Sequence, residues 1–268
     1  MKKVLFFILF ISTAGSLFAQ DSTLSKRQKR EIQKAERRQR INSIIRQEEE
    51  GTLVYDKQSA FGLQLRTNGY GAFYELGRMK SPRFTNLYSI EFTEIKHPKE
   101  ERIGNSQSFF GNSFIFGKVN NFYALKFGYG QQYIFGQKGN KNGVAVMGIY
   151  SGGLSMGLLK PYYLQVVDSS NNQKTIKFST RDSVLFLNGP FIGGAGFTKG
   201  LNEIKLRPGV FAKAALRFDF GRYNESISAI EIGISVETYA KKVEILHYNK
   251  QRQLYYQGHL AFLFGRRK

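Results

Sequence analysis

The chain ends in the stretch LYYQGHLAFLFGRRK, residues 254–268, and this stretch decides the fold. Alternate positions in it are aromatic or apolar, at Tyr256, Leu260, Phe262 and Phe264. The positions between them are polar or small, at Gln257, His259 and Ala261. Because successive side chains of a strand point to opposite faces, the pattern predicts a strand with one apolar face. The strand stops at three cations, residues 266–268.

The same period of two recurs along the chain from about residue 60. In residues 61–77 the apolar set moves from odd to even numbers across Asn68-Gly69, a pair that favours two-residue hairpin turns. Ten strands result if residues 174–199 are partly loop, and twelve are favoured. The twelve predicted strands lie near residues 59–67, 70–79, 86–96, 112–119, 122–135, 143–150, 154–167, 174–187, 191–199, 208–220, 226–246 and 252–265.

A soluble β-sandwich would also alternate, with its apolar face turned inward. Two features favour a transmembrane barrel, which turns its apolar face outward to lipid. The strands are long, and their polar faces mix full charges with Gly and Ala. Aromatic residues make up 15% of the chain, and it has no Cys. The sequence therefore predicts an all-β fold: a transmembrane, antiparallel, up-and-down β-barrel of 10–12 strands, preceded by a short basic helix.

An even number of strands places both chain ends on the same side of the membrane, which is the periplasmic side of such barrels. Short turns are expected on that side at 120–121, 151–153 and 188–190. The longer connections at 97–111, 136–142 and 199–207 are expected on the outer side. Short inner turns and longer outer loops are the usual asymmetry of outer-membrane barrels.

The N-terminal region differs from the barrel pattern. Residues 1–19 have two lysines, a short apolar run and small residues before Gln20, the layout of a secretory signal peptide. Residues 20–52 are predicted to form a basic helical periplasmic segment, with nine Lys or Arg against two Glu between Leu24 and Arg46. Residues 53–268 are the predicted barrel, integral to the outer membrane of a Gram-negative bacterium. Export argues against nucleic acid as a partner, although the formal net charge is +20.

The polar faces of the predicted strands carry charges of both signs. Mixed signs can neutralise one another in a narrow barrel, whereas a selective pore more often concentrates one sign. We therefore favour a plugged barrel, and a channel with transverse charge separation is the alternative. The residues predicted to form this lumen charge network are Arg66, Glu75, Glu91, Lys126, Lys213, Arg217, Asp219, Glu231 and Glu237.

The last strand has two further expected roles. Leu260, Phe262 and Phe264 should close the barrel by pairing with the first strand, which leaves no open edge. The same residues resemble the C-terminal signal read by the barrel-assembly machinery, a predicted partner during insertion. That signal normally ends on an aromatic residue, whereas four residues follow Phe264 here.

The sequence offers no catalytic constellation. Its three histidines, His97, His247 and His259, lack metal-ligand spacing, and no Ser stands in a nucleophile-elbow motif. The prediction is a protein that is not an enzyme, with no catalytic residues, no cofactor and no metal.

The stretches LRTNGYG (65–71), IKHPKE (95–100) and GLLKPYYLQV (157–166) resemble a family of uncharacterised bacterial outer-membrane β-barrel proteins. The resemblance implies fold and location, and it implies no catalytic residues. His97, Pro98, Lys99 and Glu100 end a strand, because Pro98 cannot donate to a ladder, and they also form a candidate partner-binding rim.

Three functions follow, in order of preference. The first is a non-enzymatic, plugged outer-membrane barrel that serves in an envelope assembly or transport complex. The second is a small-solute channel, and the third is a barrel-embedded enzyme acting on lipid or peptide. Expected partners are the outer-membrane lipid and envelope proteins, bound through residues 21–51 or the outer loops.

Overall fold

A computed structural model of the chain describes residues 30–39, 42, 55–104, 113–139, 142–168, 170–179 and 182–268. It divides into two units, residues 1–49 and 50–268. In the first unit, residues 30–39 form a fully exposed helix, which confirms the predicted short basic helix. The predicted signal peptide lies outside the described residues.

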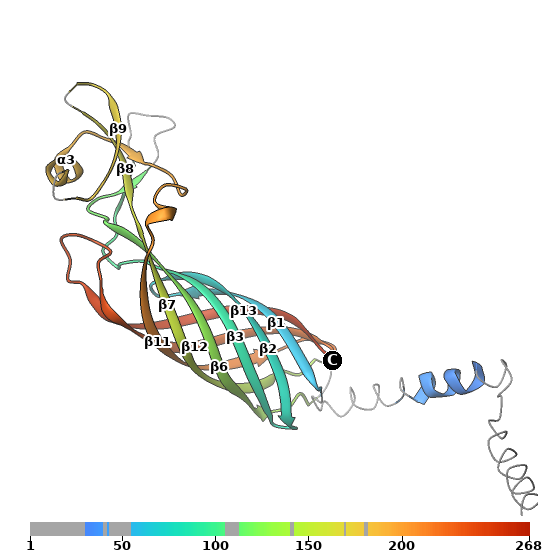
Figure 1. Cartoon of the computed structure of the whole chain (residues 1–268). Helices are drawn as coiled ribbons and strands as arrows, with labels where there is room; N and C mark the ends of the chain where they lie inside the picture. Colours follow the sequence, from blue (N-terminus) through green and yellow to red (C-terminus); the bar gives the residue numbers. More distant parts are fainter. Residues whose placement is uncertain are drawn as a thin grey trace, which may run out of the picture. The chain divides into compact units, whose positions relative to one another are not determined.

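In the second unit, eight antiparallel strands close into a barrel (Figure 1). They are β1 (Lys57–Arg66), β2 (Gly69–Ser81), β3 (Phe84–Ile95), β6 (Asn120–Gly136), β7 (Ala145–Pro161), β11 (Lys205–Asp219), β12 (Ser226–Val243) and β13 (Arg252–Arg267).

Each barrel strand pairs with its neighbours in chain order, and β1 pairs with β13 to close the ring. In that seam Leu260 lies opposite Leu65, and Phe262 lies opposite Leu63. The predicted antiparallel, up-and-down barrel is therefore confirmed. The first hairpin is two residues long, as predicted, but its turn is Thr67-Asn68 because Arg66 pairs with Gly69.

The predicted count of 10–12 barrel strands is wrong, and the four surplus strands of the favoured twelve have two causes. The predicted strands 143–150 and 154–167 form one strand, β7, up to Pro161. The predicted strands 112–119, 174–187 and 191–199 contribute only short pieces outside the barrel sheet. Merging one pair and removing three leaves eight.

The predicted turn at 151–153 is instead a closely packed part of β7. A Cβ on Gly153 would lie 2.0 Å from the carbonyl oxygen of Phe127, so this glycine allows close approach between strands. The predicted strand 174–187 is wrong in its second half, because β9 ends at Lys177 and the short helix α3 (Ser183–Asn188) begins after Asp182. Ser179 donates a hydrogen bond to Asp182 over 3.1 Å just before this helix.

The connections divide between the two barrel ends. At the end that carries the chain ends of the barrel, called the termini end, the connections span 82–83, 137–144 and 220–225. At the other end, called the loop end, they span 67–68, 96–119, 162–204 and 244–251. Residues 136–142 are predicted on the outer side, and this is wrong because residues 112–119 form no barrel strand, which shifts the alternation by one connection.

The connection 162–204, called the extension, forms a small structure of its own at the loop end (Figure 1). Its three-stranded sheet has the order β10-β8-β9, beside α3 and the short helix η1 (Leu201–Glu203). Those strands are β8 (Tyr163–Val167), β9 (Gln173–Lys177) and β10 (Phe191–Gly194). A separate pair, β4 (Arg102–Ile103) with β5 (Phe114–Ile115), lies in the connection between β3 and β6. Phe114 packs into the core of the extension with Leu164, Val166, Ile176 and Phe186.

The two faces of the barrel wall differ in chemistry, as the alternation requires. The outer face exposes large apolar side chains along every strand, among them Phe61, Leu63, Ile90, Phe127, Leu154, Leu216, Ile234, Leu260 and Phe264. The inner face buries charged and small residues. Within the described residues, no helix combines the length and apolar character that crossing a bilayer requires.

Candidate functional site

The nine residues predicted for the lumen charge network all lie on the inner face and are all buried. Strand parity positions them, because each alternates with an outward-facing neighbour. Eight of them form one connected set of ion pairs, and Asp219 belongs to a second cluster.

Lys213 lies at the centre of this network. Its ammonium nitrogen is 3.1 Å from a carboxylate oxygen of Glu91, 3.4 Å from Glu231 and 3.6 Å from Glu75. The Arg217 guanidinium lies 2.6 Å from both Glu75 and Glu231. One lysine and one arginine therefore hold three carboxylates from three different strands, β2, β3 and β12.

The network continues toward the loop end through Lys126. The ammonium of this lysine lies 3.7 Å from the carboxylate of Glu91 and also pairs with Glu237. Arg66 pairs with the same Glu237 carboxylate. Four cations and four carboxylates are thus connected across the barrel and balance in formal charge. Balanced pairing is what makes burial of this many charges tolerable.

Several polar residues that the sequence analysis did not assign to the network complete it. His259 places Nε2 3.1 Å from Glu231, and the Tyr239 hydroxyl donates to Glu237 over 2.8 Å. Arg217 also donates to Gln132 over 3.3 Å. The inward parity of His259, Tyr239 and Gln132 is the sequence signal that places these uncharged side chains beside the charges.

Asp219 lies apart from these residues, at the termini end. It pairs with Arg267, next to the last residue of the chain, and lies 3.8 Å from Lys138. The Arg267 guanidinium is also 5.2 Å from the centre of the Tyr55 ring. One of the three cations at residues 266–268 therefore turns back into the barrel.

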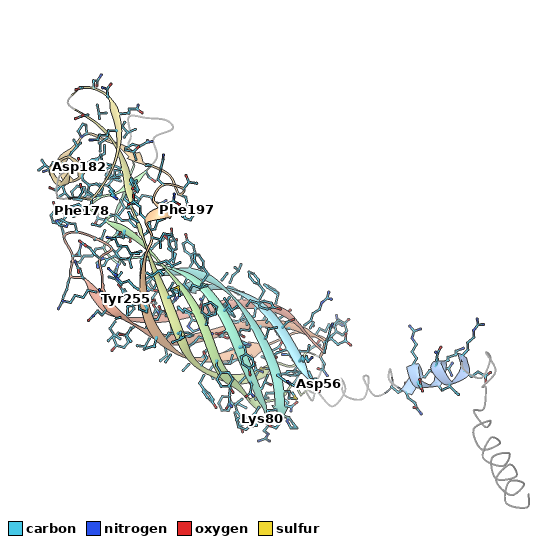
Figure 2. All side chains as sticks on the ribbon, viewed as in Figure 1. Asp56, Lys80, Phe178, Asp182, Phe197 and Tyr255 are labelled. Carbon is cyan, nitrogen blue, oxygen red and sulfur yellow. The ribbon has the colours of Figure 1, made fainter. Side chains whose placement is uncertain are left out.

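Apolar clusters fill the inner face on both sides of the charges. At the loop end the cluster contains Ile95, Phe122, Leu159, Tyr239, Val243, Ile245, Leu246 and Tyr255. Ile245 and Leu246 come from the β12–β13 connection, which is held inward because the N–H of Val119 donates to the carbonyl of Ile245 over 2.9 Å. Toward the termini end, Phe73 and Leu263 belong to a second cluster. Figure 2 shows Tyr255 toward the loop end, and Asp56 and Lys80 at the opposite end.

The candidate rim His97–Glu100 forms a tight turn after β3. The backbone N–H of His97 donates to Glu100 over 3.0 Å, and the N–H of Lys99 donates to Nδ1 of His97 over 3.2 Å. Glu100 also pairs with Lys118 at 2.9 Å. Burial lowers the pKa of His97, which keeps Nδ1 available as an acceptor at neutral pH. Pro98 and Lys99 are exposed, whereas His97 and Glu100 hold the turn.

The C-terminal residues predicted for closure lie as expected on the outer face. Leu260 lies between Leu65 of β1 and Ile232 of β12, and Phe264 lies opposite Phe61. Among the described residues, no group of three or more His, Cys, Asp or Glu could hold a metal ion. That the protein is not an enzyme stays a prediction.

A closed eight-stranded barrel with an apolar outer face and a charged inner face defines a transmembrane β-barrel of the outer-membrane type. The chain is similar in fold to Neisserial surface protein A, at 9% identity over 79% of this chain and 96% of that one, with a TM-score of 0.37. It is similar to Ail of Yersinia pestis at 10% identity over 80% and 100% of the two chains, with a TM-score of 0.35. The N-terminal barrel domain of Pseudomonas aeruginosa OprF gives 10% identity over 79% and 98%, with a TM-score of 0.32.

No protein-family model matches the sequence, and no curated protein matches it. The family resemblance of the stretches 65–71, 95–100 and 157–166 therefore stays an expectation.

Proposed function

We propose that this chain is a non-enzymatic, integral outer-membrane protein. Its barrel is plugged, and it serves in an envelope assembly or transport complex. Its apolar outer face suits a lipid environment. Ring closure also pairs the backbone N–H and C=O groups of the edge strands, which would be costly to leave unpaired in lipid. The loop end, which lies opposite the chain ends, then faces the cell exterior.

The buried ion-pair network carries the proposal that the barrel is plugged. The interior of an eight-stranded barrel is just wide enough to be filled by side chains. Here its middle holds four cations that are ion-paired with four carboxylates, with apolar clusters on either side. An ion crossing this lumen would have to break pairs among Glu91, Lys213 and Glu231 without replacement by water.

Planar-bilayer recording tests this point against the channel alternative. We expect the purified, folded barrel to give no stable conductance steps, whereas an open porin in the same bilayer conducts. Lys126→Gln serves as the check on any steps that occur, because Lys126 lies in the lumen and links Glu91 to Glu237. Steps whose ion selectivity differs between the native chain and Lys126→Gln would show that the lumen conducts, and the plugged barrel would be wrong.

The extension supports the part of the proposal that concerns partners. It has a core of its own and exposes apolar side chains, including Val184 on α3 and Phe197 between β10 and η1. Figure 2 shows Phe178 and Asp182 within it. Chemical crosslinking and mild-detergent purification should recover a stable partner with the native chain. A chain in which residues 163–200 are replaced by a short turn should lose that partner, and recovery of the lone barrel in both cases would contradict the proposal.

A further inference from the structure

A cavity of about 590 Å³ lies at the loop end, on the outer face of the barrel. One wall comes from the last outward-facing positions of β3, β6 and β7, represented by Glu94, Tyr123 and Lys160. The other wall comes from the extension, including Phe197 and Lys199. Figure 2 shows Phe197 on the extension near the barrel.

The cavity begins where the apolar outer face ends. Phe92, exposed on the barrel wall, stacks on the Tyr123 ring with 5.8 Å between ring centres, and Tyr123 lines the cavity. The Tyr123 ring in turn lies 6.3 Å from the ring of Phe197. Aromatic girdles of this kind mark the membrane–water interface of barrels. In the bilayer implied by the proposed function, on which this inference rests, the cavity lies at the level of the lipid headgroups.

The cavity has more cationic than anionic lining. Its cations are Lys96, Arg102, Lys118, Lys160 and Lys199, against two carboxylates. One carboxylate is engaged, since Glu100 pairs with Lys118 at 2.9 Å, and the other, Glu94, lies opposite Tyr70 in the β2–β3 ladder.

Lys160 is a buried cation that lines this cavity. It is 2% exposed, its ammonium donates to the backbone carbonyl of Phe197, and it lies 3.9 Å from the centre of the Phe197 ring. Among the described residues it forms no ion pair with a carboxylate. Arg102 and Lys199 are exposed at the same cavity and also form no described ion pair. An ammonium held this way retains donors for an anionic ligand.

We propose that this cavity binds the phosphorylated headgroup of an outer-leaflet glycolipid. Phosphate accepts charge-assisted hydrogen bonds from lysine and arginine. The cavity lies beside the exposed apolar face of β3 and β6, so the acyl chains of the lipid can lie along the barrel wall. The headgroup then enters the cavity between Lys160 and Lys199. The volume falls within the range of small-molecule sites.

The test uses the full chain, purified in uncharged detergent, and three probes: lipid A, dephosphorylated lipid A and inorganic phosphate. We expect lipid A to bind and raise the unfolding temperature, and dephosphorylated lipid A to bind at least about tenfold more weakly. Arg102→Ala combined with Lys199→Ala removes two exposed cations and should weaken lipid A binding by about tenfold or more.

Lys241→Ala combined with Lys242→Ala is the matched control, because these exposed lysines lie at the loop end of β12 and outside the cavity. Equal weakening by both double variants, or equal binding of the two lipid forms, would overturn the proposal. Binding of inorganic phosphate without lipid A would assign the cavity to a free anion and contradict the lipid. Each variant is first shown to be heat-modifiable on a gel, so that failure of the barrel assignment is recognised separately.

Discussion

Leu260→Arg is expected to abolish most of the folded barrel in the outer membrane. Leu260 lies near the middle of β13, outward-facing, between Leu65 and Ile232. An arginine on the lipid face near the bilayer midplane costs about 2–4 kcal/mol. Refolding into lipid vesicles, followed by urea titration, would measure the loss of unfolding free energy. In cells, the unfolded chain should be degraded in the periplasm.

Val184→Arg is the control for that substitution. Val184 is 71% exposed, but it lies in α3 of the extension, outside the barrel wall. An exposed arginine in water changes the unfolding free energy little, so this variant should fold and insert like the native chain. Equal tolerance of both arginines would mean that Leu260 does not face lipid, and the orientation of the last strand would be wrong.

Glu231→Leu is expected to destabilise the barrel by about 3–5 kcal/mol, because it leaves buried cations without their main partner. Glu231 lies 2.6 Å from Arg217, 3.4 Å from Lys213 and 3.1 Å from His259, and its side chain is fully buried. Combining it with Arg217→Met removes one charge of each sign. The double variant should lose less stability than the sum of the two single variants, as measured by urea unfolding in vesicles.

Glu203→Gln provides the comparison for an exposed ion pair. Glu203 pairs with Lys177 on the extension, and both side chains are exposed. Solvent screens such a pair, so its removal should leave unfolding almost unchanged. If Glu231→Leu were as mild as Glu203→Gln, water would reach the lumen charges, and the plugged barrel would have to be given up.

The sequence predicts the faces of the strands better than their number. Residues such as Glu91 and Lys213 are placed correctly because side-chain direction follows from the period of two alone. The strand count fails at Gly152 and Gly153, where glycine serves close strand packing in β7 although it reads as a turn. It also fails in residues 174–187, where Ile176, Phe178 and Phe186 pack in the core of the extension and not on a barrel wall.

The contacts of the site depend on which strands face each other across the lumen, and this follows from the number of strands in the ring, which the sequence does not reveal. Arg217 and Glu75 are distant in sequence and meet only because the narrow lumen brings β11 and β2 face to face. The cavity at Lys160 was missed for a related reason, since its second wall comes from the extension. A lysine at an outward position of β7, beside Pro161, was the one available signal for an interface site.

The central claim, a closed barrel integral to the outer membrane, is tested most directly by fractionating cells and running the membrane protein on a gel with and without boiling. Ring closure satisfies the ladder of every strand, so the folded barrel should resist detergent until it is heated. We expect the chain in the outer-membrane fraction, with different mobilities before and after boiling. Recovery in the soluble periplasmic fraction, with identical mobility in both samples, would contradict the account.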